Sequence, residues 1–297
     1  MSRPRQLPLD ERSIRDRAKN AGLPAARVVR EISLNQLHRR LAFAGVEVLV
    51  KGGEALVARR LSTRATRDLD VRTNERDLDR ALTSIRHALE ADLGDGLLYR
   101  IESVVRDVSR QNTGGYAGMQ LTLSVSLGVR QFDRFAIDLV VGKELTGTPT
   151  AAPSPLSLEM PELDPLTVLL YPSVDHIADK VCATHATYGS GNKPSSRVKD
   201  LYDLCVLRGA EDLDAALLYE AIAAESVARG LPVPKRIAVP VSMRARFEQL
   251  ARREPHRRVP EAFDDAVQAV ADFLDPVVGG PVPHGTWDPV THRWVRA

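Results

Sequence analysis

Hydrophobic positions recur at helical spacing near the start of the chain and change to strand-like alternation further on. Between residues 10 and 44 apolar side chains return at mostly helical spacing, with a break at Gly22-Leu23-Pro24, which predicts helices on either side. The clearest alternation, from Gln120 to Ser126, predicts a strand with one buried face. The same criteria predict strands at 46–51, 68–72, 97–106, 119–127 and 133–141, and helices at 55–60 and 75–92.

The second half of the chain has a different pattern. Residues 142–163 are rich in Thr, Pro, Ala and Ser, which predicts a connecting segment rather than a packed element. Helical spacing prevails beyond it, with Ser173 as the expected N-cap of the first helix. The proline-rich tail is expected to be irregular, with Trp287 and Trp294 holding it to the body. Helices are predicted at 174–187, 196–208, 212–228, 241–253 and 260–274.

These elements predict an α+β fold, with a mixed sheet followed by a helical C-terminal half. A chain of 297 residues, 43% of them hydrophobic, can bury a sizeable core and divide into domains. We assign residues 1–45 to N-terminal helices that pack on the core, 46–160 to an α/β domain and 161–297 to a helical domain.

Composition narrows the class of protein. The N-terminus lacks the apolar segment of a signal peptide and no stretch could span a bilayer, so we expect a cytoplasmic protein that binds no membrane. Cys182 and Cys205 lie in apolar helical patterns and are expected to be buried thiols. The net charge of +2 does not by itself indicate a nucleic-acid binder. Two arginine clusters are either solvated helix faces or phosphate contacts: Arg12, Arg15, Arg17, Arg27 and Arg30, and Arg244, Arg246, Arg252, Arg253, Arg257 and Arg258.

A pair of acids and a pair of glycines are the first candidates for chemistry. Asp68 and Asp70 project from one face of a strand, and two such carboxylates repel unless a cation such as Mg²⁺, shared with substrate phosphates, lies between them. About fifteen residues earlier, Gly52-Gly53 would let the backbone approach a phosphate, at a helix starting near Glu54. Each pair alone is more often a turn or a surface pair. Together they are typical of a polymerase-β-like nucleotidyltransferase domain.

A third carboxylate, Asp138, lies in an otherwise apolar predicted strand. A lone acid there is costly unless it is paired or bound to a cation, and the alternative is an acid at a strand edge that faces water. Because a polymerase-β-like site needs one more carboxylate from a neighbouring strand, we favour the functional interpretation of Asp138.

The helical half carries a second polar constellation. Lys180 lies on one predicted helix, and Arg197, Asp200 and Asp203 lie roughly one above another on the next. Considered alone, this pattern favours an exposed ladder of ion pairs.

The chain resembles the AbiEii/AbiGii toxin family, including the mycobacterial MenT-type toxins, over roughly residues 30–205. The matching features are Lys51-Gly52-Gly53, Arg67-Asp68-Leu69-Asp70, Asp138, Ala178-Asp179-Lys180 and the segment Arg197-Val198-Lys199-Asp200-Leu201-Tyr202-Asp203-Leu204. The resemblance implies that the catalytic residues are Asp68, Asp70, Lys180 and Asp200. It implies nucleotide binding by Lys51, Gly52, Gly53, Arg67 and Arg197, and metal binding by Asp68, Asp70 and Asp138.

The activity implied by this resemblance is Mg²⁺-dependent transfer of a nucleoside monophosphate from an NTP, with a pyrimidine NTP favoured, to the acceptor end of tRNA. Blocking the tRNA 3′ end would stop aminoacylation and translation, and a cognate antitoxin is expected. Glu54 departs from the pattern, because a negative charge replaces the small hydroxyl residue that often follows the glycines. Two alternatives stay open: a protein or small-molecule hydroxyl as the acceptor, or a non-catalytic nucleotide-binding module of the same fold.

Overall fold

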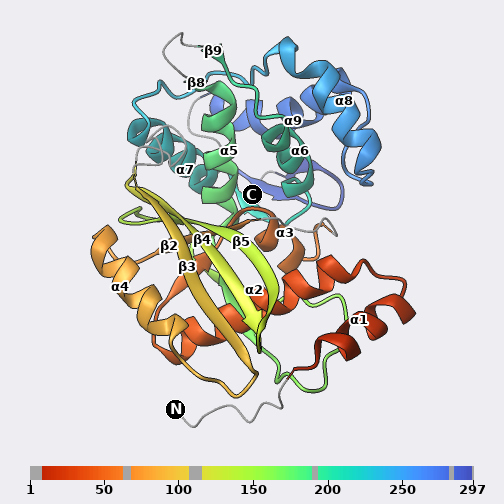
Figure 1. Ribbon diagram of the computed structural model, residues 1–297. Coiled ribbons are helices and arrows are strands. Elements are labelled where there is room, and N and C mark those ends of the chain that lie inside the picture. The colour runs from red at the N-terminus through yellow and green to blue at the C-terminus, as the bar shows by residue number, and fades with distance from the viewer. Residues whose placement is uncertain (1–8, 63–67, 107–115, 189–192, 281–283, 296–297) are drawn as a thin grey trace.

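The fold is α+β, with one large mixed sheet (Figure 1). Two helices precede the first strand of this sheet along the chain, and most of the other helices follow its last strand. The computed structural model describes residues 9–62, 68–106, 116–188, 193–280 and 284–295. Within these ranges, seven strands form the sheet in the order β3-β4-β5-β2-β1-β7-β6. The strands are β1 (Val48–Val50), β2 (Leu69–Thr73), β3 (Leu97–Arg106), β4 (Gly118–Leu127), β5 (Arg130–Val140), β6 (Thr150–Pro153) and β7 (Thr167–Leu170).

The sheet is mixed because two of its neighbouring strand pairs are parallel. β2 runs parallel to β5, and β1 runs parallel to β7, while the other neighbouring pairs are antiparallel. The alternation seen in the sequence of β4 is explained by burial, since Leu121, Leu123 and Val125 are all inaccessible to solvent. The predicted alternation is therefore confirmed.

Two N-terminal helices pack into the same hydrophobic core as the sheet. These are α1 (Glu11–Asn20) and α2 (Ala25–Phe43), separated at Gly22 as the sequence predicts. Asp10 caps α1 by accepting bonds from the N–H groups of Arg12 and Ser13. Helix α4 (Leu78–Leu89) contacts α2 and β3 and contributes to that core.

The C-terminal elements form a second hydrophobic cluster. Its helices are α5 (Ser173–His185), α6 (Val198–Leu207), α7 (Ala215–Ala228), α8 (Arg244–Arg253) and α9 (Phe263–Val278). Leu56, from the short helix α3 (Gly52–Ala58), and Leu61 belong to this cluster too. Figure 1 shows α3 between the sheet and the upper helices. The division at residue 160 stays a prediction, because packing of α3 links the two cores.

Small strands complete the structure. β8 (Thr187–Tyr188) pairs with β9 (Lys193–Pro194), and β10 (Leu213–Asp214) pairs with β11 (Thr286–Asp288), which pairs with β12 (Arg293–Val295). The indole of Trp287 is buried and donates to the carbonyl of Arg208 at 2.7 Å, and that of Trp294 donates to Phe273 at 2.8 Å. The two tryptophans therefore hold the tail to the body, as expected, although part of the tail forms strands.

Two sequence-based predictions were wrong. Residues 142–163 were expected to form a connecting segment, but β6 lies there, and β7 follows in the region where helices were expected to dominate. Both strands have four residues, and β6 at the sheet edge contains alanine and proline, so neither carries a clear periodic signal. Ser173 is the first residue of α5 rather than its N-cap, which is Pro172.

None of the described helices is long and apolar enough to cross a membrane.

Candidate active site

Two carboxylates from different strands lie side by side in the sheet. The parallel register of β2 and β5 pairs Asp70 with Asp138. Paired residues on neighbouring strands project from the same face, so the two carboxylates share one side of the sheet. β4 brings Gln120 opposite Asp138, and the Gln120 amide donates to the Asp138 carboxylate at 2.8 Å.

Gly52 lies directly against Asp70. Its φ angle is +59°, which side chains other than glycine rarely adopt. A Cβ atom at this position would come within 1.9 Å of Oδ2 of Asp70. The N–H of Lys51 donates to the carbonyl of Asp70 at 2.8 Å and fixes the glycine turn against β2. A glycine is therefore needed here both for backbone conformation and to leave room for the Asp70 carboxylate.

Glu54 points away from the acidic pair. Its side chain is 2% exposed and contacts the imidazole of His38 on α2 at 3.1 Å. The concern that Glu54 would place a negative charge beside a bound phosphate is thereby removed.

The pKa values of the acidic pair reflect burial and mutual repulsion. Burial, followed by the charge of Asp138, raises the pKa of Asp70 to about 6, although the cations Lys51 and Lys180 act in the opposite direction. Burial also raises the pKa of Asp138, and the charge of Asp68 adds to that rise. Asp68 is exposed just before β2, near enough for its charge to act on both carboxylates. Three acids thus repel one another at one end of β2, which a bound cation would relieve.

A cavity of about 300 Å³ opens beside Asp70 and Asp138. Three cationic side chains from distant parts of the sequence line it: Lys51 before α3, Arg197 before α6 and Arg229 after α7. The volume lies at the lower end of the range for small-molecule sites. Asp179 lines the cavity as well, so the cavity carries three carboxylates and three cations. Such a mixture suits an anionic ligand that binds together with a cation.

Lys180 lies in a buried cluster beside this cavity. Its ammonium group contacts Asp200 at 3.2 Å and Asp203 at 2.7 Å, and Arg197 pairs with the second oxygen of Asp200 at 2.5 Å. Lys180, Asp200 and Asp203 are all buried, so they do not form the exposed ladder that their spacing alone favours. Burial opposes ionisation of Asp200, but Lys180 and Arg197 outweigh it and lower the pKa of Asp200.

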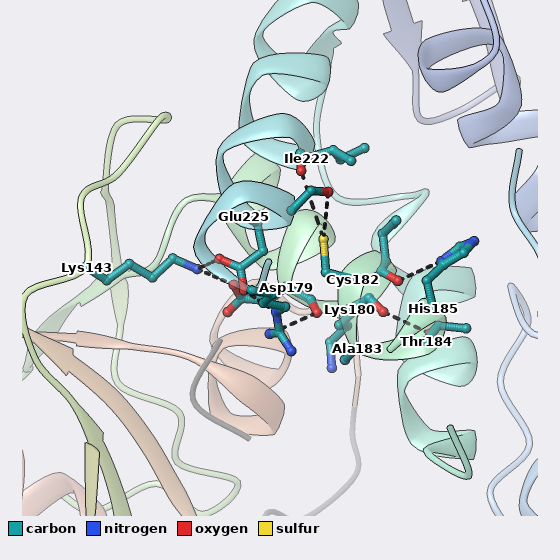
Figure 2. Close-up of polar contacts among 12 residues, drawn as sticks. Lys143, Asp179, Lys180, Cys182, Ala183, Thr184, His185, Ile222 and Glu225 are labelled. Atoms are coloured by element: carbon teal, nitrogen blue, oxygen red, sulfur yellow. Dashed lines mark hydrogen bonds and ion pairs between the residues drawn. The ribbon is translucent and has the colours of Figure 1, made fainter. Parts of the chain in front are cut away.

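The structure adds residues to which the sequence analysis assigned no role. Asp179 pairs with Lys51 at 2.6 Å and also with Lys143, which contacts Glu225 at 2.6 Å (Figure 2). Arg229 in turn pairs with Glu225 at 2.6 Å. Glu225 and Arg229 are four residues apart at the end of α7, a spacing that predicts an ion pair. The spacing does not show that this pair lies beside the cavity. Arg67, predicted to bind nucleotide, lies outside the described residues.

The residues of this site fit a divalent cation shared with a substrate. Among the described residues, no group of three or more His, Cys, Asp or Glu side chains is arranged to hold a metal ion. Mg²⁺ in proteins is commonly bound by one or two carboxylates plus substrate phosphates, and Asp70 with Asp138 matches that donor set.

A family model described as nucleotidyl transferase AbiEii toxin, type IV TA system, matches residues 36–283. The chain belongs to this family. It is therefore a nucleotidyltransferase toxin, an enzyme that uses an NTP, and its type IV system implies a cognate antitoxin. The match includes the region after residue 210, which the sequence analysis could not relate to any family, and so extends to Glu225 and Arg229.

Other comparisons give more distant likenesses to this AbiEii-family chain. No curated protein matches it. A crystal structure of JHP933 from Helicobacter pylori is 12% identical with a TM-score of 0.37, covering 67% of this chain and 80% of that one. A second H. pylori structure, titled a "putative nucleotidyltransferase", is 11% identical with a TM-score of 0.36, covering 68% and 82% respectively.

Gly52→Ala is expected to impair the toxin through both backbone and packing. We expect about 1–2 kcal/mol lower stability from the positive φ angle, and at least about 10-fold slower transfer because the Asp70 carboxylate must move. Thermal unfolding and NTP transfer assays measure the two effects. Gly45→Ala is the matched control, since Gly45 has φ of +72° but open space around its Cβ position. Equal transfer rates for both variants would contradict this role of Gly52.

Proposed function

We propose that this toxin transfers a nucleoside monophosphate from an NTP to the 3′ end of tRNA in the cytoplasm, in a Mg²⁺-dependent reaction that blocks aminoacylation. One arrangement carries the proposal. Asp70 pairs in register with Asp138, Gly52 packs directly against Asp70, and the two acids face a cavity lined by three cationic side chains. Family membership supplies the nucleotidyl chemistry. The metal, the acceptor and the roles of individual residues are our proposal.

Asp70 and Asp138 would hold Mg²⁺ together with the substrate phosphates, and the nearby charge of Asp68 would add to the attraction. When bound, Mg²⁺ offsets the negative charge of the triphosphate and acts as a Lewis acid. In the transfer, the acceptor hydroxyl oxygen forms a bond to the α-phosphorus and the bond from that phosphorus to the β-phosphate oxygen breaks. Pyrophosphate leaves, and we propose that Asp138 takes the hydroxyl proton. The Gln120 amide donates to one oxygen of Asp138 and so orients the carboxylate for this role.

The cations would bind the phosphates. Lys51 precedes the glycine pair and lines the cavity with Arg197, so both can contact a triphosphate there. Lys180 does not line the cavity, but its charge acts on the acidic pair and, like that of Lys51, lowers the pKa of Asp70. Asp200 would orient Lys180 and Arg197 together, since it contacts both.

The acceptor is the part of the proposal that rests on resemblance. The decisive experiment incubates the purified protein with total tRNA, Mg²⁺ and each labelled NTP in turn, with total protein as a parallel acceptor. We expect label at the tRNA 3′ end from one NTP, release of pyrophosphate, and loss of both when the metal is chelated. Label found in protein and not in tRNA would mean that the acceptor is a protein hydroxyl. NTP binding without any transfer would favour a non-catalytic module.

Arg252 and Arg253, at the end of α8, are the proposed contacts to the tRNA backbone. Both are exposed, and the following His256 donates to the carbonyl of Leu61, in the segment that precedes Asp68. Arg253 pairs with Glu254 at 2.9 Å but its side chain is 66% exposed, whereas Arg27 of the N-terminal group pairs with Glu31 and is 24% exposed.

Reversing both charges, with Arg252→Glu and Arg253→Glu, should weaken tRNA modification and reduce its log–log salt slope by about one unit per lost phosphate contact. NTP affinity should survive, because the cavity is lined by other residues. The measurement is the transfer rate across a salt series. Arg80→Glu with Arg86→Glu on α4 serves as the control for the same change of net charge, because both arginines are exposed and belong to neither arginine cluster. Unchanged rate and slope in the double variant would mean that this cluster is a solvated face.

A further inference from the structure

Asp179 occupies an unusual position between two lysines. Its carboxylate, 14% exposed, accepts from Lys51 on one oxygen at 2.6 Å and from Lys143 on the other. Burial opposes ionisation of Asp179, but Lys143, Lys51 and Arg229 outweigh it and hold its pKa well below the usual range. Figure 2 shows the ammonium group of Lys143 reaching both Asp179 and Glu225. Asp179 is therefore a charged group with both oxygens engaged.

The two lysines differ in their access to the cavity. Lys143 is 4% exposed and does not line it, whereas Lys51 and Asp179 both do. Lys143 thus anchors Asp179 from behind, and Asp179 anchors Lys51 at the cavity wall. Lys51 is also fixed at its backbone, where its N–H donates to Asp70. Its long side chain is consequently held at both ends, between the acidic strand β2 and helix α5.

The charges of this cluster leave it positive. Lys51, Lys143 and Arg229 carry three positive charges, and Asp179 and Glu225 carry two negative ones. Pairing with Asp179 therefore places Lys51 without neutralising the cluster as a whole. A free lysine side chain has about 2 kcal/mol of rotamer entropy to lose when it binds a phosphate, and a held side chain has already lost it. Such preorganisation is how charged groups stabilise a transition state.

We propose that Asp179 is a positioning residue for nucleotidyl transfer, which holds the ammonium group of Lys51 at the cavity wall where the triphosphate binds, while Lys143 holds Asp179. The inference rests on the proposed NTP site and adds to it the group that orders the phosphate-binding lysine. Asp179 acts through Lys51 and touches no reacting atom.

The test is Asp179→Asn in the full-length protein, assayed with labelled NTP, Mg²⁺ and total tRNA. The amide keeps the shape but loses the ion pairs, so Lys51 keeps its charge and loses its position. We expect kcat to fall about 10- to 10²-fold, as for other misplaced groups. KM for NTP should rise, because the released lysine must lose its rotamer entropy when it binds the phosphate. Asp179→Glu, which restores the carboxylate, should recover part of the lost rate.

Asp175→Asn is the matched control for a purely structural effect. Asp175 is a buried acid one turn earlier on α5, and it accepts from the backbone N–H groups of Thr146 and Gly147 at 3.0 and 2.9 Å. This variant should lower the midpoint of thermal unfolding without lowering kcat. If both variants lose kcat in proportion to their loss of thermal stability, Asp179 is structural and the proposal is overturned.

A double-variant comparison tests whether Asp179 acts through Lys51. Lys51→Met combined with Asp179→Asn should be no slower than Lys51→Met alone, because the lysine to be positioned is gone. If Asp179→Asn slows transfer by the same factor whether or not Lys51 is present, the two residues act independently and the proposal is overturned. Calorimetric titration of wild-type protein with NTP and Mg²⁺ separates this inference from the function beneath it. Absence of both binding and transfer in the wild type defeats the proposed function, whereas an active wild type and an equally active Asp179→Asn defeat only this inference.

Discussion

Asp70→Asn is expected to abolish nucleotidyl transfer while leaving the protein as stable as the wild type or more stable. Asp70 faces Asp138 across the parallel strand pair, and burial and repulsion raise its pKa to about 6. The amide keeps the size of the side chain and removes this repulsion, so unfolding should not occur at a lower temperature. Transfer should fall by about 10²-fold or more, because the charge that holds the cation and the triphosphate is lost.

Transfer of label from NTP and thermal unfolding, measured on the same preparation, test this expectation. Asp133→Asn is a suitable control on β5, since Asp133 pairs with Arg30 at 2.7 Å and does not line the cavity. That control should keep its transfer rate. An Asp70→Asn protein that transfers at the wild-type rate would remove Asp70 from the proposed site.

Lys180→Ala is expected to lower both stability and transfer. Lys180 is the buried partner of Asp200 and Asp203, and removing it leaves Asp203 without its contact at 2.7 Å. Loss of one partner from a buried ion pair costs about 3–5 kcal/mol. Transfer should fall as well, because the charge of Lys180 acts on Asp70. Denaturant unfolding and the NTP transfer assay measure the two losses.

A second substitution separates the two roles of Lys180. In Lys180→Ala with Asp203→Ala, the acid that lost its contact with Lys180 is removed as well, while Arg197 still pairs with Asp200. This double variant should be more stable than Lys180→Ala alone and should still fail to transfer. Recovery of transfer together with stability would mean that Lys180 only supports the fold.

The elements that the sequence predicted well are those with a strong local period. The break at Gly22, the strand at β4 and the helix at α4 follow from apolar spacing and from turn residues, which act over a few positions. β6 and β7 escaped prediction because a four-residue strand acquires its identity from the neighbours with which it pairs. The burial of Asp200 was missed for a similar reason. Its helical spacing favoured an exposed ion-pair ladder, but its burial depends on the packing of α5 against α6.

By itself, the sequence determined which chemical groups share a local face. The two-residue period of a strand puts Asp68 and Asp70 together, and the glycine pair marks a close approach of the backbone. Only the tertiary structure decided which distant charges meet. Lys51, Asp179 and Arg229 come together because helices pack on the sheet and on each other, and no local spacing encodes that packing. The strand acids were therefore predictable as candidates, and the family resemblance pointed to Lys51 and Arg197, whereas Arg229 and the contact of Asp179 with Lys51 were not predictable.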